Sequence, residues 1–409
     1  MTLVLASWPA TTADVLFATA GGVIAVFALY LLLIVLAALL GRKRLGLDPA
    51  TSSTQGTIAV VIPAHDEEQL VAGTVASLRD QTYPRERYEI IVVADNCTDE
   101  TAAVARAAGA DVLVRNVPDS RGKGYALKWA FERILAREDP PDAVVVVDAD
   151  SVADPAFLTL LESHRQEGAD VVQGESLLVP DGSTTGALRA TAFLLVNRAR
   201  PLGRAVLGLP PRLSGNGMLF ARHLLEHHPW DAFTSTEDVE YAVKLRLDGI
   251  EPVFARGATV LSPVAPTPRA AQEQQLRWEG GQLHLARTYV PTLLVRGLRE
   301  RRAAFFDAAL ELVVPPTGYL FAAGLALTAG AAALAAIGVL DAWAVAPAAV
   351  GVVGLVLYVL VGLRAAEAPS SAYRALLGAP RLVLGKVARA HRLLGFRPDS
   401  WVRTERRGE

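Results

Sequence analysis

Two aspartates follow a run of valines in the stretch VVVVDAD, which runs from Val144 to Asp150. Consecutive β-branched residues are typical of a strand that is buried on both faces, as in the centre of a parallel sheet. Open α/β sheets bind ligands beyond the carboxyl ends of their strands, so Asp148 and Asp150 are expected where a ligand would bind. Two carboxylates at this spacing can bind one divalent cation, while Ala149 points away. The alternative is a solvated turn or helix cap.

Three further segments carry side chains that could bind or activate a ligand. Asp95 ends a second apolar segment, YEIIVVAD, and should reach the same rim of the sheet. Lys123 stands between two glycines at a predicted helix start, where a phosphate would be favoured. Asp238 opens another predicted helix, which limits its orientation. Each has a structural alternative: Asp95 or Asp238 could be a helix cap, and Lys123 a surface residue.

A later segment, QQLRW, places Gln274, Arg277 and Trp278 at helical spacing on one face. Arg277 could hold an anionic group through two parallel hydrogen bonds, and Trp278 could provide a flat apolar surface on which a ligand stacks. The alternative is a tryptophan at the membrane surface beside a solvated arginine. In the stretch SGNGMLF, Gly215 and Gly217 would allow the backbone to approach a ligand closely.

Composition limits the class of protein. With 409 residues and 52% hydrophobic content, the chain exceeds one ordinary domain and is too apolar to lack a membrane part. The net charge of −2 argues against a polybasic nucleic-acid-binding protein. The single cysteine, Cys97, excludes an internal disulfide framework and a multi-cysteine zinc site. The histidines His223, His227 and His228 are expected on a helix surface, because the predicted metal site has oxygen ligands.

Strands and helices are predicted to alternate between Thr57 and about Val179. Helical segments should begin near Glu67, Thr98, Gly122 and Pro155, and a mostly helical part follows. Such alternation predicts an α/β fold with a mostly parallel central sheet and helices on both faces. The expected strands cover residues 57–63, 88–95, 110–115, 143–150 and 169–175.

Three uncharged runs are long enough to cross a membrane: Val15 to Leu40, Leu312 to Leu340, and Ala342 to Leu363. Basic residues Arg42 to Arg44 follow the first run, and the turn between the other two has none. The positive-inside rule therefore predicts the N-terminus outside, the soluble domain in the cytosol and an inner-membrane location. The tail from Arg364 is basic and amphipathic, which suits either the membrane surface or an ordinary solvated helix.

These patterns divide the chain into six parts. Residues 1–44 form a transmembrane helix with its basic anchor, 45–56 a linker, and 57–292 the cytosolic domain. An interface helix follows over 293–311, then a transmembrane hairpin over 312–363 and the basic tail over 364–409.

Taken together, the motifs resemble those of membrane-bound family 2 glycosyltransferases, the group that includes the cellulose, chitin and hyaluronan synthases and ceramide glucosyltransferase. The resemblance covers Thr57 to about Tyr289, in the family's order and at similar spacing, although Asp66 stands where the family more often has asparagine. The matching stretches are VIPAHDEE from Val61, VVADNCTDET from Val92, DAD from Asp148, TED from Thr236 and QQLRW from Gln274.

The resemblance implies a GT-A-like nucleotide-sugar-binding domain that uses a UDP-sugar and Mg²⁺ or Mn²⁺. Asp150 would be the main metal ligand, and Asp148 would contact the ribose or complete the metal shell. Ala64 and Glu67 match the first nucleotide-contacting turn, and Asp95 matches the residue that contacts the uracil or ribose.

It also implies transfer with inversion, which needs one general base near the acceptor hydroxyl, on the sugar face opposite the leaving diphosphate. Asp238 would be this base. Lys123 and Arg277 would bind the diphosphate. The acceptor would contact Gly215, Glu237, Gln274 and Trp278.

Other classes of protein fit less well. A nucleotidyltransferase has no need for TED and QQLRW, and a carbohydrate-binding module would keep Trp278 without needing the four aspartates. We expect a lipid or lipid-linked acceptor at the cytosolic leaflet, because three uncharged spans can hardly enclose a path for a polar polymer. The alternative is a polysaccharide synthase that obtains a channel from a protein partner or by oligomerising.

Overall fold

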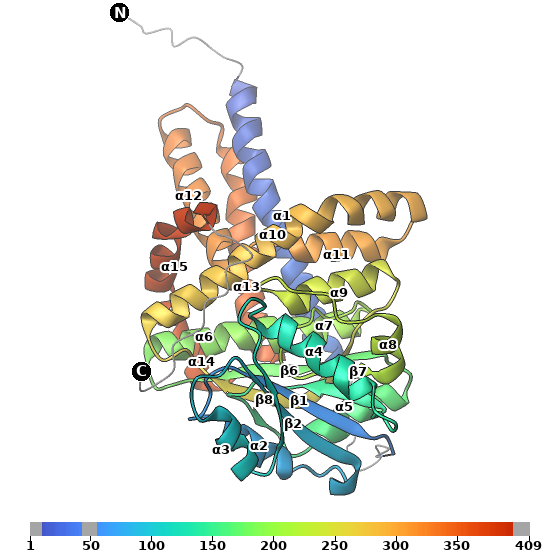
Figure 1. Ribbon diagram of the computed structural model, residues 1–409. Coiled ribbons are helices and arrows are strands. Elements are labelled where there is room, and N and C mark those ends of the chain that lie inside the picture. The colour runs from blue at the N-terminus through green and yellow to red at the C-terminus, as the bar shows by residue number, and fades with distance from the viewer. Residues whose placement is uncertain (1–9, 43–54, 396–409) are drawn as a thin grey trace, which may run out of the picture.

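The computed structural model describes residues 10–42 and 55–395, and these form a mixed β-sheet flanked by helices and joined to three long apolar helices (Figure 1). The sheet has the strand order β3-β2-β1-β4-β7-β6-β8-β5. Its strands are β1 (Ile58–Ala64), β2 (Tyr88–Asp95), β3 (Asp111–Arg115), β4 (Ala143–Val146), β5 (Val152–Ala153), β6 (Val171–Val179), β7 (Met218–Ala221) and β8 (Val253–Pro263).

The half of the sheet formed by β3, β2, β1 and β4 is wholly parallel, and β6 also pairs in parallel with β8. The predicted α/β class and the existence of the five predicted strands are therefore confirmed, but the fourth strand, predicted over 143–150, ends at Val146. The part after Val179 is mostly helical, as expected, but it also contributes β7 and β8, which were not predicted. β7 is only four residues long and pairs antiparallel with both β4 and β6, so its position depends on long-range pairing.

Both faces of the sheet are buried, and side chains of β1 alternate between two cores. Ile58, Val60 and Ile62 face one core, whereas Ala59 and Val61 face the other. Helices on both faces leave no solvated side to the central parallel strands β1, β2 and β4, which explains their apolar runs, whereas the edge strand β3 is partly exposed. The first core is covered by α2 (Val71–Arg79), α3 (Thr101–Ala107) and α5 (Phe157–Gln166), and the second by α4 (Lys123–Leu135), α8 (Arg222–His227) and α9 (Glu237–Leu247).

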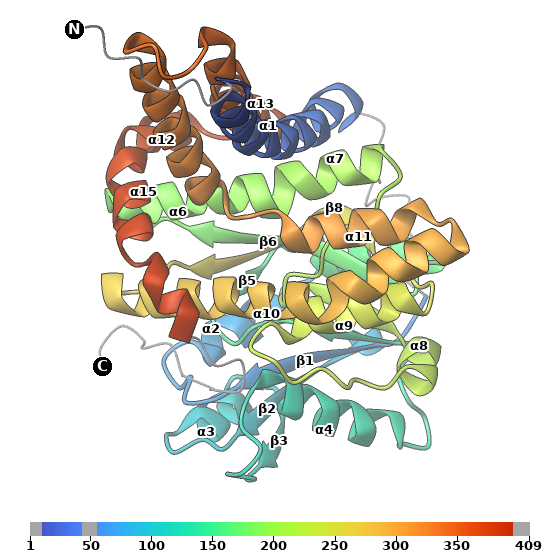
Figure 2. The same cartoon turned by 90° about the horizontal axis from the view of Figure 1, so that it is seen from above.

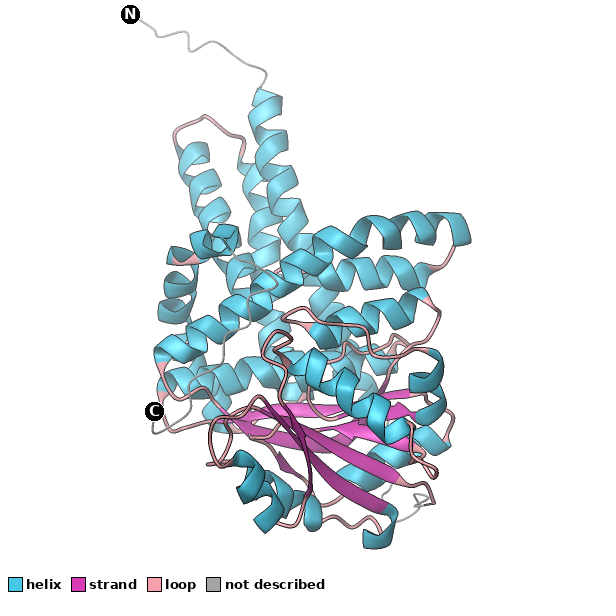
Figure 3. Ribbon diagram, viewed as in Figure 1, coloured by secondary structure: helices cyan, strands magenta, loops and turns pink. Residues whose placement is uncertain are grey.

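A layer of helices lies between the sheet and the apolar helices, as Figures 2 and 3 show. In this layer α7 (Arg200–Val206) packs directly against α1 (Ala10–Gly41), and a Cβ at Gly203 would come within 1.9 Å of the Ile34 carbonyl oxygen. Glycine thus permits the close contact between this layer of helices and the first apolar helix. The elements around this layer are α6 (Thr184–Leu194), a π-helical turn η4 (Leu195–Ala199), α7 (Arg200–Val206), α10 (Pro268–Glu300) and α11 (Ala303–Val313).

Three helices are long and apolar enough to cross a membrane: residues 12–41 in α1 (Ala10–Gly41), α12 (Thr317–Ala336), and residues 342–365, which comprise η5 (Ala342–Val345) and α13 (Ala346–Ala365). The second span begins later than the predicted Leu312, because Pro315 and Pro316 separate α11 from α12. Small residues bring α1 and α13 together, since a Cβ at Gly351 or Gly354 would meet α1 at about 3.0 or 3.1 Å.

Polar contacts tie α1 to the hairpin at both ends. Arg42 donates to the carbonyl oxygens of Arg364 and Ala365, each at 3.2 Å, and pairs with Glu367 at 3.1 Å. At the opposite end, the Asp341 N–H donates to the Asp14 carboxylate at 2.8 Å. The ends of α1 and α13 that adjoin the α/β domain therefore lie together, and residues 43–54 of the predicted basic anchor and linker lie outside the described residues.

The tail continues as α14 (Ser370–Ala375), a turn η6 (Leu376–Gly378), α15 (Ala379–Ala388) and a turn η7 (Ala390–Gly395). A short turn η3 (Arg85–Arg87) directly precedes β2. Lys386 of α15 pairs with Glu279 of α10 at 2.5 Å and lies over the ring of Tyr319. The tail therefore docks on α10 and α12, while Leu384 stays 72% exposed. α10 runs through position 292, so one helix continues across the division that the sequence suggested there.

A buried ion network joins the α/β domain to the membrane helices. Arg204 of α7 and Arg246 of α9 both bind Asp307 of α11, at 2.5 and 2.9 Å. Arg246 also binds Glu311 at 2.9 Å, and Arg204 donates to the Tyr30 hydroxyl of α1 at 2.9 Å. Four elements that are distant in sequence thus share one set of charges.

We expect Asp307→Asn to lower the stability of the protein by about 3–5 kcal/mol, because it leaves two buried arginines without their shared carboxylate. The thermal midpoint of the purified protein in mild detergent measures this loss. Asp231→Asn is the matched control, since Asp231 is 58% exposed and pairs with Lys244 at the surface. Equal shifts in the two variants would show that the network contributes no more than a surface pair.

Candidate active site

Asn216 joins the end of β4 to the turn formed by residues 215–217, which we call the glycine turn. The Asp148 N–H donates to the Asn216 side-chain oxygen at 3.1 Å, and Asn216 donates to the Ser151 hydroxyl at 2.8 Å. The glycines on either side, Gly215 and Gly217, have φ values of +76° and +69°, which favour glycine. The turn is therefore held directly against the DAD segment, as close backbone approach requires.

Lys123 connects this turn to Asp148. Its ammonium group donates to the Asp148 carboxylate at 2.5 Å and to the Gly215 carbonyl oxygen. Burial alone would lower the pKa of Lys123, but the carboxylates of Asp148 and Glu237 raise it above its ordinary value. Gly124 allows the helix start to approach its neighbour, because a Cβ there would come within 2.2 Å of the Ala232 carbonyl oxygen.

Asp238 lies in the first turn of α9 and faces the same turn. A Cβ at Gly215 would come within 3.3 Å of one Asp238 carboxylate oxygen and 3.6 Å of the Lys123 nitrogen. Thr236, not Asp238, occupies the N-cap position. We call Lys123, Asp148, Gly215 and Asp238 the central cluster: four segments that are separated in sequence converge there.

Electrostatics favour a proton acceptor in the central cluster. Burial raises the pKa of Asp238 above its ordinary value, although the positive charges of Arg212 and Lys123 act in the opposite direction. Burial, together with the neighbouring charge of Asp238, raises the pKa of Glu237 to about 7. A carboxylate with a raised pKa is a stronger base, as general-base catalysis needs.

Asp148 and Asp150 fit a site for a hard divalent cation. Both side chains are half-exposed beyond the end of β4, whereas Ala149 between them is buried, as the spacing predicted. The Ser151 hydroxyl lies 3.4 Å from one Asp150 oxygen. The donor set consists of carboxylate oxygens, which Mg²⁺ and Mn²⁺ accept.

The predicted helix that carries Gln274, Arg277 and Trp278 is α10. It packs on the loop before α9, because a Cβ at Gly281 would come within 2.6 Å of the Thr236 side chain. Trp278 packs against Phe193 of α6, with ring centroids 5.7 Å apart. Its half-buried ring is therefore partly used in packing between helices, and the role of all three residues in the site stays a prediction.

The turn after β1 lies beside the end of β2. Ala64 ends β1 and the Glu67 N–H donates to the Thr101 hydroxyl at 2.7 Å. The Asp95 carboxylate is buried against the Arg115 guanidinium at 2.5 Å. Burial raises the pKa of Asp95, and the hydrogen bond from Arg115 opposes this rise. α3 begins only at Thr101, so the alternative interpretation of Asp95 as the cap of that helix is wrong.

Asp66, the departure from the family's asparagine, has a backbone role. Its φ of +53° is in the left-handed region, which aspartate and asparagine tolerate better than most residues. Its carboxylate accepts a hydrogen bond from the Thr98 N–H at 2.6 Å. The substitution therefore keeps the conformation of the turn.

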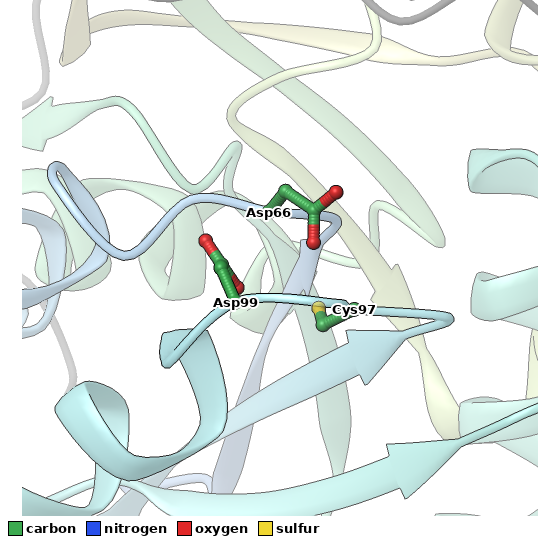
Figure 4. Close-up of side chains that lie close together, drawn as sticks. All are labelled: Asp66, Cys97 and Asp99. Carbon is green, nitrogen blue, oxygen red and sulfur yellow. The ribbon is translucent and has the colours of Figure 1, made fainter. Parts of the chain in front are cut away.

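Figure 4 shows Asp66 near Cys97 and Asp99. Potential ligand atoms of these three residues lie within 4.8 Å of one another, and no other group of three such residues occurs among the described positions. The Asp99 carboxylate already accepts from the N–H groups of Glu68 and Thr101, at 3.1 and 3.0 Å. Turn hydrogen bonds thus account for the cluster without an ion.

The three histidines are surface residues, as predicted. His223 is 63% exposed and contacts Asp170 at 2.8 Å. His228 lies 3.2 Å from Asp248, and His227 contacts the carbonyl oxygen of His223 within the same helix.

Four residues that the sequence did not single out support the site: Asn216, Gln173, Arg115 and Arg212. Gln173 holds the glycine turn by donating to the Asn216 carbonyl oxygen and accepting from the Ser214 N–H, both at 2.9 Å. Arg115 fixes Asp95, and Arg212 lies near Asp238. The local signal for Asn216 is its position between two glycines. The contacts of Gln173, Arg115 and Arg212 depend on the topology of the sheet and have no local signal in the sequence.

Comparison with known proteins finds similarity over the part of the chain that contains the central cluster. The family model "Glycosyltransferase like family 2" matches residues 55–281, more than half of the chain. A beta-monoglucosyldiacylglycerol synthase of Nostoc sp. is 26% identical over 234 residues, which cover 55% of this chain and 48% of that protein. The probable glycosyltransferase YdaM of Bacillus subtilis is 24% identical over 56% of each chain. The chain thus spans about half the length of these relatives.

Among solved structures, the chain is similar to a mannosyltransferase from Pyrobaculum calidifontis that was determined in complex with GDP-Man and Mn²⁺. The two are 19% identical, the match covers 83% of this chain and 97% of the other, and the TM-score is 0.48.

Proposed function

Since the chain belongs to the family 2 glycosyltransferases, we propose that it moves a sugar, with inversion, from a UDP-sugar to a hydroxyl of a membrane lipid or lipid-linked acceptor. The observation that carries this proposal is the convergence of Lys123, Asp148, Gly215 and Asp238. It brings the proposed donor side and a single base within one cluster, in a domain attached to three apolar helices.

Asp238 acts as the general base in this mechanism. It takes the proton of the acceptor hydroxyl while the oxygen forms a bond to the anomeric carbon of the donor. The bond from that carbon to the diphosphate oxygen breaks, and its electron pair leaves with UDP. Asp238 has the raised pKa that suits this step.

Asp148 and Asp150 would hold Mg²⁺ or Mn²⁺, whose charge stabilises the leaving diphosphate. The Lys123 ammonium group donates to the Asp148 carboxylate, so it would lie beside a diphosphate bound there. Arg277 would hold the diphosphate from α10. Ala64, Glu67 and Asp95 would bind the nucleotide at the ends of β1 and β2. Gly215, Glu237, Gln274 and Trp278 would contact the acceptor.

A lipid acceptor is supported by the membrane part. The three apolar helices pack on one another through small residues, and α7 packs on α1. The name of the Nostoc relative also describes a glycolipid synthase. We infer that the domain works at the cytosolic leaflet of the cell membrane, with the N-terminus outside.

Reconstitution tests the acceptor. Purified protein alone in liposomes, with a panel of UDP-sugars and Mg²⁺ or Mn²⁺ outside, should produce a short glycolipid that extracts into organic solvent. The physical reason is that a growing polar chain needs a protein-lined path, which three apolar spans can hardly provide. Mass spectrometry identifies the sugar, and the anomeric configuration of the product tests inversion.

The alternative is a polysaccharide synthase that uses a partner or oligomeric channel. A long water-soluble polymer in the liposome lumen would contradict the lipid-acceptor proposal. No UDP release from any UDP-sugar would contradict the proposed donor.

A further inference from the structure

A pocket separates the C-terminal tail from α10 at the point where the second apolar helix, α12, begins. Its volume is about 50 Å³, which leaves room for several water molecules or for a phosphate group. The tail side of the pocket carries three basic residues, Lys386, Arg389 and Arg392. The opposite wall belongs to α10, and Tyr319 of α12 closes one side.

The pocket lies at the end of α12 that adjoins the α/β domain. Tyr319 is in the first turn of α12, and a Cβ at Gly318 would come within 3.4 Å of the Lys386 side chain. Figures 1 and 2 both show α15 beside α12. The same tail exposes apolar side chains, since Leu377 is 87% and Leu384 is 72% exposed. Exposed apolar side chains next to basic ones, at the end of a membrane span, suit the boundary between lipid headgroups and acyl chains.

The ion pairs around the pocket leave two of its arginines without a carboxylate. The two carboxylates that line the pocket already have cationic partners, in the pairs Lys386–Glu279 at 2.5 Å and Arg269–Glu273 at 3.0 Å. Arg389 and Arg392 form no ion pair with any carboxylate in the part of the chain that the structure describes. The Arg389 guanidinium lies over Gly385, where a Cβ would come within 3.1 Å of it. An anion in the pocket would therefore meet two positive charges that no described carboxylate neutralises.

A phosphate group matches these two arginines. A guanidinium presents parallel N–H donors at a spacing that fits two phosphate oxygens, and it stays charged at physiological pH. At the end of a membrane span, phosphate groups are supplied by lipid headgroups, and basic pockets beside such spans bind anionic headgroups. The acyl chains of a lipid bound there would contact the apolar surface of α12.

The pocket is separate from the proposed donor site. Glu279 follows Gln274 by five residues, which places the two about 140° apart around α10. The wall of the pocket therefore faces away from the side of the helix that was predicted to contact the acceptor. The diphosphate is expected beyond β4, at Asp148 and Asp150, and none of the described residues that line the pocket belongs to the central cluster.

We propose that this pocket binds the phosphate of an anionic phospholipid in the leaflet next to the α/β domain, and that Arg389 and Arg392 hold it. The lipid is a bound ligand and not the acceptor of the sugar. It links the tail to α10 in addition to the pair of Lys386 with Glu279. The inference goes beyond the transfer reaction and holds for any sugar and any acceptor.

Native mass spectrometry of the delipidated full-length protein in mild detergent counts bound lipids directly. The three probes are phosphatidylglycerol, phosphatidylcholine and inorganic phosphate. We expect phosphatidylglycerol to bind at a lower concentration than phosphatidylcholine, because the choline group of the latter repels the two arginines. Inorganic phosphate should not displace the lipid, because it has no acyl chains to contact α12.

Replacing both arginines, as Arg389→Gln with Arg392→Gln, should weaken phosphatidylglycerol binding by roughly thirty-fold, because each basic residue near an anionic lipid contributes roughly five-fold. The matched control is Arg374→Gln with Arg381→Gln, which removes the same charge from exposed positions of the same tail that do not line the pocket. This control should keep most of the affinity. Arg389→Lys with Arg392→Lys retains both charges and should bind more tightly than the glutamine variant.

Equal losses in the two glutamine double variants would overturn the inference, because the tail would then attract anionic lipid only through its overall charge. Equal binding of the two phospholipids, or displacement of phosphatidylglycerol by inorganic phosphate, would overturn it as well. The thermal midpoint in detergent without added lipid shows whether each variant is folded. Since lipid binding is measured without sugar transfer, its failure leaves the proposed reaction untouched, and an inactive enzyme leaves the lipid site untouched.

Discussion

Asp238→Asn is expected to reduce sugar transfer by about 10²- to 10⁴-fold, the usual effect of losing a general base, and to leave binding of the UDP-sugar almost intact. Asparagine has nearly the same shape and keeps the contacts of the helix start, but it cannot take the proton of an acceptor hydroxyl. The Asp238 carboxylate faces Gly215 and lies near the positive charges of Arg212 and Lys123. Steady-state transfer and equilibrium donor binding, measured on the same preparation, separate the two effects.

The matched control is Asp248→Asn, at the other end of α9, where Asp248 is 56% exposed. This variant should transfer sugar at nearly the wild-type rate. Transfer by Asp238→Asn at the wild-type rate would rule out the assigned mechanism. Loss of donor binding together with transfer would instead indicate a structural role for Asp238.

The pH profile gives a second readout for the same variant. A base acts only when it is deprotonated, so the wild-type rate should rise with pH through the raised pKa of Asp238 and then level off. Asp238→Asn should lack this rise in its residual activity.

The sequence predicted those parts of the fold that depend on local pattern. Continuous runs of apolar residues identified β1, β2 and β4, since parallel strands buried on both faces have such runs. The polar residues that follow these runs indicated the rim of the sheet. The apolar lengths of α1, α12 and α13 were equally clear. β7 was missed because a strand of four residues gives too little pattern, and its position is set by pairing with β4 and β6.

The site was predicted in its residue types more than in its contacts. Asp148, Lys123 and Asp238 stood out because each follows a strand or opens a helix, and the fold then brought them together through Gly215. Asn216 and Gln173 carry no chemistry of their own, and only the meeting of β4, β6 and β7 gives them a role. The network of Arg204, Arg246 and Asp307 likewise arises from helices that meet only in the folded chain.

Removing divalent cations should abolish transfer, since the proposed stabilisation of the leaving diphosphate is ionic and uses oxygen ligands. EDTA treatment is expected to reduce activity to background, and added Mg²⁺ or Mn²⁺ should restore it. Zinc should substitute poorly, because Asp148 and Asp150 provide carboxylates without cysteine or histidine. Full activity after rigorous metal removal would refute the assignment of the DAD segment.

Asp150→Asn should weaken metal-dependent binding of UDP, because one of the two proposed carboxylate ligands becomes a neutral amide. Calorimetric titration of UDP with and without Mn²⁺ measures this binding independently of transfer. Asp119→Asn, in an exposed loop before α4, is the matched control and should bind UDP as the wild type does. If Asp150→Asn bound UDP with unchanged affinity and unchanged metal dependence, the cation would have to be held elsewhere. Without the Asp150 carboxylate, the only remaining charged ligand is Asp148, whose charge is already paired with Lys123. The loss of metal-dependent UDP affinity in Asp150→Asn should therefore be larger than expected from removing one of two equivalent carboxylates.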